Sequence, residues 1–296
     1  MKKNMTFTLT GWFVLSILLF SLWGCTRRDL EEESSSVGSV TLNFNWMNLE
    51  TDDELPTGMQ LYFYSSDGTI LTREATSSGF TGTLPSGTYQ VLAYNSDGQN
   101  VTQRNLSSYE EAEVYAPVYT RSSSYLYQPS HCYGVGLALF TVVSGDSASA
   151  TMIPRNFVRR AVIKVEAGSY ADQISSCSGI MSGFSPGAYI SSGELVGESG
   201  TLYFDTEKGS TSFTGEASFF GKDTGEQNAL HLDLQMVAGS EQFLNVDITD
   251  LLKDVNTVEV DIQIDVTIEV IDSETILSGI TIKPWEEVDG GGGEVR

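Results

Sequence analysis

The sequence predicts an all-β protein in which two tandem antiparallel β-sandwich domains follow an N-terminal export signal. Apolar and polar residues alternate with a period of two, most clearly over residues 258–270, where one face is aliphatic and the other is charged or polar. Turns rich in glycine, asparagine, aspartate and proline separate these alternating segments. The helical signal is weak. Its best case is one short turn over Ile248–Lys253, which Thr249 or Asp250 would cap.

The first 24 residues predict a lipoprotein signal peptide. A basic start precedes a nearly uninterrupted apolar run over residues 11–20. This run is shorter than the ~20 residues that a membrane-spanning helix requires. The segment Leu22-Trp23-Gly24-Cys25 resembles a lipobox, although Trp23 stands where a small residue is usual. The resemblance implies cleavage before Cys25, which would carry the lipid as the first mature residue.

Residues 25–36 form an acidic linker behind the lipid attachment site. Its acids are Asp29, Glu31, Glu32 and Glu33. This cluster resembles the export tag of Bacteroidales lipoproteins, which implies an outer-membrane location facing the cell exterior. A solvated linker is the alternative interpretation.

We expect the N-terminal sandwich over residues 37–150. Apolar residues recur at every second position over 40–46, 59–63 and 89–93. Asp67-Gly68 and Pro85-Ser86-Gly87 supply turns between these segments. This pattern is typical of half-buried antiparallel strands joined as meanders.

The second sandwich is expected over residues 151–286, because a small polar segment and Pro154 interrupt the pattern just before a new strand over 161–167. Further alternation appears over 230–236 and 258–270. Both domains are near the ~100 residues of a typical β-sandwich. The glycine-rich tail, residues 287–296, is expected to be flexible.

Charge excludes one class of partner. The 296 residues contain 16 Lys and Arg against 39 Asp and Glu, which gives a formal net charge of -23 at pH 7. Because such a chain is repelled by nucleic acid and by anionic membrane surfaces, nucleic-acid binding is excluded.

Two cysteines remain beside Cys25. Cys132 and Cys177 could form a disulfide in an oxidising compartment, or both could be buried free thiols. Their spacing decides neither proximity nor geometry, so both alternatives stay open.

Motifs for catalysis are weak, and the sequence predicts neither an enzyme, nor a cofactor, nor a metal site. Residues 183–187 match the G-x-S-x-G elbow, but Pro186 has no N–H to donate to an oxyanion hole. His131 and Cys132 are adjacent, so on a strand they would point to opposite faces. A hydrolase with paired carboxylates is a lesser alternative, as is incidental calcium at residues 52–54.

Tyrosines are concentrated in one stretch of the chain. Its members are Tyr109, Tyr115, Tyr119, Tyr125, Tyr127 and Tyr133. Tyrosine combines contact area with a polar group, as in glycan platforms and protein interfaces. We therefore take these residues as candidate ligand or interface aromatics, with packing as the alternative.

Several turn and strand motifs lie along the mature chain. They are Asn45-Trp46, Pro56-Thr57-Gly58-Met59, Leu84-Pro85-Ser86-Gly87, Ala93-Tyr94-Asn95, Phe219-Phe220-Gly221, 246–250 and Lys283-Pro284-Trp285. Together these motifs resemble an uncharacterised family of Bacteroidales fimbrillin-like surface lipoproteins, similar to minor-fimbrium anchor and accessory subunits. The resemblance covers nearly all of the mature chain and implies transthyretin-like, Greek-key sandwiches.

The resemblance also implies a role as a pilus anchor, tip or accessory subunit in adhesion, with other fimbrial subunits as partners through strand donation. Fimbrillin-like subunits lose an N-terminal strand by cleavage after an arginine. Here Arg27 and Arg28 adjoin the lipid, so cleavage there would release the protein from its anchor. This favours an unprocessed anchor or accessory role, although Arg73, Arg104 and Arg121 stay open as sites. The alternative function is a glycan-binding lipoprotein beside a polysaccharide importer.

Overall fold

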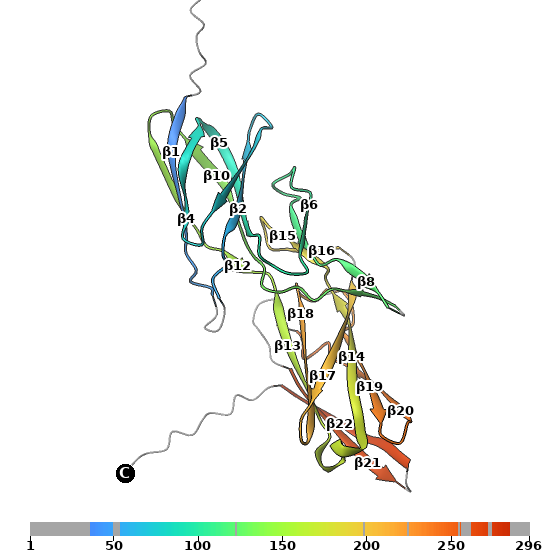
Figure 1. Ribbon diagram of the computed structural model, residues 1–296. Coiled ribbons are helices and arrows are strands. Elements are labelled where there is room, and N and C mark those ends of the chain that lie inside the picture. Colours follow the sequence, from blue (N-terminus) through green and yellow to red (C-terminus); the bar gives the residue numbers. More distant parts are fainter. Residues whose placement is uncertain are drawn as a thin grey trace, which may run out of the picture.

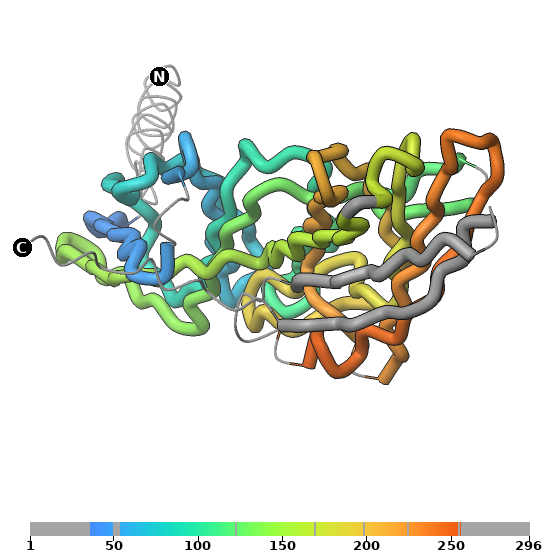
Figure 2. The backbone as a smooth tube through the Cα atoms, turned by 90° about the horizontal axis from the view of Figure 1, so that it is seen from below, coloured from blue at the N-terminus to red at the C-terminus, as the bar shows by residue number. Residues whose placement is uncertain are grey.

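The computed structural model describes residues 36–49, 54–121, 123–197, 199–223, 225–253, 255, 262–271 and 274–284. The chain forms two lobes, one after the other, in an elongated molecule (Figures 1 and 2). Strands dominate both lobes, and the 3-10 segment η1 (Gly168–Gln173) is the one helical element among the described residues. No helix in this described part is long and apolar enough to cross a membrane.

The N-terminal lobe is a sandwich of two sheets. The three-stranded sheet has the order β11 (Ser147–Met152), β1 (Val37–Phe44), β4 (Gly79–Pro85). The five-stranded sheet has the order β12 (Arg155–Asn156), β10 (Tyr133–Val142), β5 (Gly87–Asn95), β2 (Met59–Ser65), β3 (Ile70–Ala75). Apolar residues of both sheets meet in one core between them.

Strand β1 lies in the middle of its sheet. Val40, Leu42 and Phe44 point into the core, as the alternation predicts. The strand pairs with β4 in the antiparallel sense but with β11 in the parallel sense. The sheets are mainly antiparallel, as predicted. Strands β1 and β11 can pair in parallel because they are distant in sequence and no hairpin fixes their relative direction.

The C-terminal lobe contains one long sheet that doubles back on itself. Its order is β20 (Glu241–Asp247), β19 (Ala229–Met236), β14 (Ile174–Phe184), β17 (Gly200–Lys208), β18 (Ser212–Phe219), β13 (Arg159–Glu166), β21 (Ile262–Ile271), β22 (Glu274–Pro284). Residues 200–205 of β17 pair with β14, whereas residues 206–208 pair with β18. Since β17 joins both halves, apolar residues on their inner faces form a second core. A further parallel pair joins β13 and β21.

Two short groups of strands connect the lobes. One is a four-stranded sheet of the order β16 (Leu195–Val196), β15 (Gly187–Tyr189), β7 (Glu113–Tyr115), β6 (Thr102–Arg104), which mixes strands from both halves of the chain. The other is the hairpin of β8 (Val118–Thr120) and β9 (Ser124–Leu126), which joins β17 through Leu126 and Leu202. Residues 102–126 thus pair with strands of the second half, and the domain division at residues 150 and 151 stays a prediction.

The all-β prediction of two sandwich lobes is confirmed. The Asp67-Gly68 turn joins β2 to β3, with the Thr69 N–H donating to the Asp67 carboxylate over 2.8 Å. The short turn after β20 forms at Ile248, but Asp247 rather than Thr249 or Asp250 accepts the first N–H, from Thr249, at 2.9 Å. Of the predicted strand 258–270, residues 258–261 lie outside the described part.

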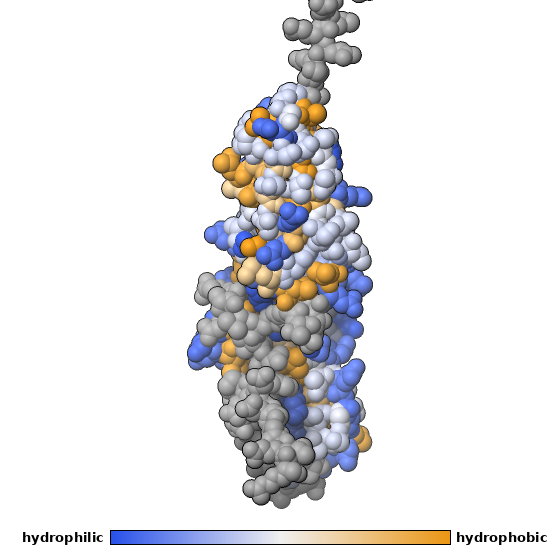
Figure 3. All heavy atoms as spheres, turned by 90° about the vertical axis from the view of Figure 1, so that its left-hand side faces the viewer, coloured by the Kyte–Doolittle hydropathy of each residue, from blue (hydrophilic) through white to orange (hydrophobic). Residues whose placement is uncertain are grey.

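Surface hydrophobic residues on the N-terminal lobe are dispersed. On the face that Figure 3 presents, orange residues are scattered among hydrophilic and neutral ones over this lobe. Single exposed apolar side chains of this kind are ordinary features of a soluble surface.

Candidate functional site

The predicted tyrosine stretch does not form one surface. Tyr109, Tyr125 and Tyr133 are buried, and Tyr115 is half-buried. Tyr133 packs edge-on against Trp46, with ring centroids 5.3 Å apart. Tyr119 and the 40% exposed Tyr127 lie instead on the β8–β9 hairpin.

The hairpin tyrosines continue into a line of side chains that crosses six strands of the C-terminal lobe. Strand register places Tyr119 opposite Tyr125, Tyr203 opposite Ile180, Ile180 opposite His231, and His231 opposite Asn245. We call these residues the outward row: Tyr119, Tyr125, Tyr203, Ile180, His231 and Asn245. Their neighbours in sequence, such as Leu126, Leu202 and Leu232, point into the core, so the row lies on the opposite, outer face.

Ring contacts tie the hairpin end of the outward row together. Tyr119 lies 4.6 Å from Tyr127 and 5.8 Å from Tyr125, measured between ring centroids. Tyr125 is 5.8 Å from Tyr203, and the Arg121 guanidinium lies 4.6 Å above the Tyr203 ring. These contacts hold the rings in defined positions, and the Tyr127 ring remains accessible to solvent.

The far end of the row carries an exposed ring and polar groups. Phe243, 55% exposed, stacks on His231 with centroids 5.6 Å apart. The His231 Nδ1 and the Asn245 Oδ1 are 2.6 Å apart. In the neighbouring line of residues, Asp205 accepts a 2.5 Å hydrogen bond from the Tyr203 hydroxyl, and Asp233 is half-buried.

Sequence reasoning missed Tyr203 and Phe243, although a local signal existed. Tyr203 lies between the inward-facing Leu202 and Phe204, and Phe243 precedes the inward-facing Leu244. An aromatic residue at a position that the alternation assigns to solvent is unusual and marks an outer face with apolar character.

A second set of tyrosines lies on the outer face of the five-stranded sheet, where the junction buries it. We call it the covered row: Tyr62, Tyr64, Leu92 and Tyr94. Tyr62 stacks on Tyr64 and on Tyr94, with centroids 6.2 Å and 6.0 Å apart. Residues of the four-stranded sheet and of the 106–116 segment pack onto it, and the Tyr64 hydroxyl donates to the Leu106 carbonyl over 3.0 Å. Burial raises the pKa of both Tyr64 and Tyr94.

Asp97 joins two of the motifs that carry the family resemblance. Its carboxylate accepts hydrogen bonds from the Thr57 N–H at 2.7 Å, the Thr57 hydroxyl at 2.9 Å and the Asn95 amide at 2.7 Å. The buried Asn95 in turn accepts the Tyr133 N–H at 2.6 Å, and His131 Nε2 lies 3.4 Å from Asp97. Partial burial alone would raise the pKa of Asp97, but the hydrogen bonds from Thr57 and Asn95 lower it to about 2.

The two mature cysteines are free and buried in different clusters. Cys132 packs at the junction and Cys177 in the core of the C-terminal lobe. The disulfide considered from the sequence is therefore not formed, since a bridge needs Cα atoms within about 7 Å. Burial raises the pKa of the Cys132 thiol and raises that of Cys177 to about 12.

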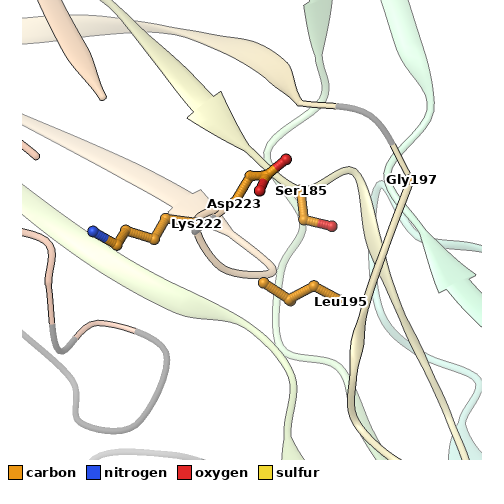
Figure 4. Close-up of a pocket in the computed structure, with 5 residues that line it drawn as sticks. All are labelled: Ser185, Leu195, Gly197, Lys222 and Asp223. Atoms are coloured by element: carbon orange, nitrogen blue, oxygen red, sulfur yellow. The ribbon is translucent and has the colours of Figure 1, made fainter. Parts of the chain in front are cut away.

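A cavity of about 200 Å³ lies beside the G-x-S-x-G segment, lined by Ser185, Leu195, Gly197, Lys222 and Asp223 (Figure 4). Its polar groups bond to partners in the surrounding structure. The buried Ser185 hydroxyl lies 2.8 Å and 2.6 Å from the carbonyls of Gly187 and Val196. The Lys222 side chain extends away from Ser185 and donates to the Thr249 carbonyl over 3.2 Å. Hydrogen bonds from Gly225 N–H and the Ser199 hydroxyl lower the pKa of Asp223.

Several predicted positions lie outside the described residues. They are Cys25, Asp29, Glu31, Glu32, Glu33, Asp52 and Asp53. Within the described part of the chain, no group of three or more His, Cys, Asp or Glu side chains has the arrangement of a metal site.

The edges of the sheets are the remaining candidates for subunit contact. In the three-stranded sheet the edges are β11 and β4, and β1 fills the space between them with continuous pairing on both sides. The N-terminal sandwich is therefore complete with its own first strand. In the C-terminal lobe, β20 and β22 are the edge strands at the two ends of the long sheet.

Comparison with known proteins gives one family and one curated relative of note. The family model described as "Domain of unknown function (DUF5119)" matches residues 24–205. The "Putative fimbrium anchoring subunit Fim4B" of Bacteroides ovatus is 25% identical over 215 residues, which cover 70% of this chain and 63% of that protein. This chain thus spans about 63% of the length of the curated relative that it matches.

Solved structures share the fold. A "putative adhesin" from Bacteroides ovatus superposes with a TM-score of 0.64 at 21% identity, covering 84% of this chain and 94% of the other. The fimbrial anchor protein Mfa2 from Porphyromonas gingivalis gives 0.50 at 12% identity, covering 83% and 97%. The predicted resemblance to fimbrillin-like surface proteins is confirmed by these matches.

Proposed function

The chain belongs to the DUF5119 family, and from this premise we propose that it is a non-catalytic fimbrial anchor or accessory subunit on the cell surface. The fimbrial role of the relative Fim4B, which is named an anchoring subunit, supports this assignment. In this proposal, residues 1–24 are removed, Cys25 carries lipid, and the acidic residues Asp29 to Glu33 direct the protein to the outer face of the outer membrane.

The observation that carries the anchor role is the position of β1. This strand begins at Val37, after Arg27 and Arg28, and it pairs with neighbours on both sides. Cleavage after either arginine would leave β1 in place and would only detach the protein from its lipid. A subunit that keeps its first strand has no vacant groove in the N-terminal sandwich for a donor strand to fill.

The later arginines also fit an unprocessed chain. Arg73 lies in β3, Arg104 lies in β6 with its guanidinium 3.4 Å above the Tyr115 ring, and Arg121 follows β8. Cleavage after any of these would separate β1 and β2, both core strands, from the rest of the chain. We propose that partner subunits bind instead at an edge of the C-terminal lobe by strand addition.

A deletion strain tests this role. Electron microscopy of native cells, with antibody against the mature chain, should show gold at fibre bases, and fibres should be lost or shed in the deletion strain. Complementation with the wild-type gene should restore attached fibres, whereas Cys25→Ala should leave fibres in the medium. Unchanged fibres in the deletion strain, with gold scattered over the cell surface, would remove the fimbrial role.

A further inference from the structure

We propose that the outward row, with Tyr127 and Phe243 beside it, binds an uncharged glycan chain that lies across the strands of the C-terminal lobe. This activity goes beyond the anchor role and does not depend on it. A surface lipoprotein that holds a fibre and also contacts polysaccharide would contribute adhesion directly.

The shape of the row fits an extended polymer. The row crosses six strands, from Tyr119 on β8 to Asn245 on β20. Strand register aligns its members except between β9 and β17, where the Tyr125 and Tyr203 rings lie 5.8 Å apart. Neighbouring strands lie about 4.8 Å apart, so the row is roughly 24 Å long. A line of that length could contact several consecutive sugar rings, whereas a small metabolite would occupy a fraction of it.

The chemistry of the row fits sugars, whose C–H faces pack on aromatic rings and whose hydroxyls need hydrogen-bond partners. Tyr127 and Phe243 present exposed rings near the two ends. Between and beside them lie polar groups that can donate to or accept from hydroxyls, namely Arg121, His231, Asn245, Asp205 and Asp233. Aromatic rings are thus concentrated at the hairpin end of the row, and polar groups at its far end beside Phe243.

The same mixture argues against a protein partner at this face. Centres of protein interfaces are depleted of charged residues, because these lose hydration when buried. Here Asp205 and Asp233 lie in the line of residues next to the row, within the area that a protein would have to cover. A glycan leaves such carboxylates partly hydrated and uses them as acceptors.

The negative charge of the protein favours neutral glycans over acidic ones. Two carboxylates adjoin the row, Arg121 is the cation of the tyrosine cluster, and the whole chain carries a formal charge of -23. Uronate-rich or sulfated polymers would be repelled. The covered row lacks this capacity, because residues of the junction occupy it.

Affinity electrophoresis of the purified mature chain tests the proposal. The gels would contain soluble starch, galactomannan, mannan or arabinoxylan as neutral polymers, and polygalacturonate or chondroitin sulfate as acidic ones. We expect at least one neutral polymer to retard the protein and the acidic polymers to leave it unretarded. The double variant Tyr127→Ala/Phe243→Ala should bind the retarding polymer about tenfold or more weakly.

Leu139→Ala is the matched control, since Leu139 is 68% exposed but lies on β10 of the N-terminal lobe. It should bind as the wild type does. The proposal is overturned if no neutral polymer retards the protein, if acidic polymers retard it equally, or if the double variant binds unchanged while remaining folded.

Complementation separates this proposal from the anchor role. Tyr127→Ala alone should restore attached fibres to the deletion strain, because Tyr127 lies outside β1 and outside the edge strands β20 and β22. Loss of fibres with this variant would identify the row as a subunit interface and would overturn the glycan proposal. Restored fibres without glycan binding in the wild type would leave the anchor role standing alone.

Discussion

Both lobes carry a row of aromatic side chains on an outer sheet face, and the two rows differ in their exposure to solvent. The covered row of the N-terminal lobe is enclosed by the four-stranded sheet and the 106–116 segment, with Tyr64 and Tyr94 only 7% and 6% exposed. In the outward row of the C-terminal lobe, Tyr125 is buried but the other five members are half-buried or exposed, and Phe243 and Tyr127 beside the row are 55% and 40% exposed.

An aromatic residue at a solvent-facing strand position can therefore have either of two roles. Where chain from elsewhere packs onto it, the ring joins the lobes and stabilises the fold. Where nothing in the described structure packs onto it, the ring contributes little to stability and is available for binding. Stability measurements therefore distinguish the two rows.

The largest expected effect is on the covered row. Tyr94→Ala removes a buried ring from the junction and should lower the free energy of unfolding by about 3 kcal/mol or more. Tyr127→Ala on the outward row should lower it by less than about 1 kcal/mol. Urea denaturation of both variants checks this, and equal losses would contradict the assignment of one row to packing and the other to binding.

A similar contrast holds within β1. Leu42→Ala should cost about 2 to 5 kcal/mol, because Leu42 is fully buried between the two sheets. Asn43→Ala, at the adjacent exposed position, should change the free energy of unfolding by no more than about 0.5 kcal/mol. If Leu42→Ala were as stable as Asn43→Ala, β1 would not be part of the N-terminal core.

A smaller, pH-dependent effect on the free energy of unfolding is expected for Asp97 in the N-terminal lobe. Its folded pKa of about 2 is below the value of about 3.9 in an unfolded chain, so its stabilisation is complete above pH ~4 and is lost as the pH falls towards 2. Asp97→Asn should cost about 1 to 2 kcal/mol at pH 7, after allowance for the 24% exposure of the side chain. The difference from wild type should shrink below pH 4.

Denaturant titrations at pH 7 and near pH 3 measure this change, with Asp172→Asn on the exposed η1 segment as the control. A difference between Asp97→Asn and wild type that stays constant over this range would mean that the carboxylate charge is not what stabilises the loop.

The smallest effect on stability is expected for the two thiols. Because Cys132 and Cys177 are free in separate clusters, a reductant should not change the melting temperature, and both thiols should react with a thiol reagent only after unfolding. A lower melting temperature in reductant would reveal a disulfide and contradict the separation of the two clusters.

Local alternation was enough to predict strands β1, β13 and β19, because each has one apolar and one polar face. Strands β2 and β5 were predicted from apolar residues at every second position, although their other faces carry the covered row. Strand partners could not be predicted. The parallel pairing of β1 with β11 and the attachment of β9 to β17 join residues far apart in sequence, and alternation gives a face but no partner.

The candidate site could be predicted from the sequence only in part, for the same reason. Tyrosines 109–133 were visible as a cluster in sequence, yet Tyr109 and Tyr133 pack inside while Tyr119 and Tyr127 lie outside. The outward row exists only through the register of six strands, so Tyr203 and Phe243 could join it only once the sheet was assembled. Asp97 had no signal beyond its place in a turn.

The most direct test of the account is the intact mass of the chain recovered from fibres purified from native cells. An anchor that keeps β1 should have the mass of a chain that begins at lipidated Cys25, and its peptides should include residues 37–44. A chain that begins after Arg73, Arg104 or Arg121, without β1, would contradict the claim that the N-terminal sandwich is closed by its own first strand.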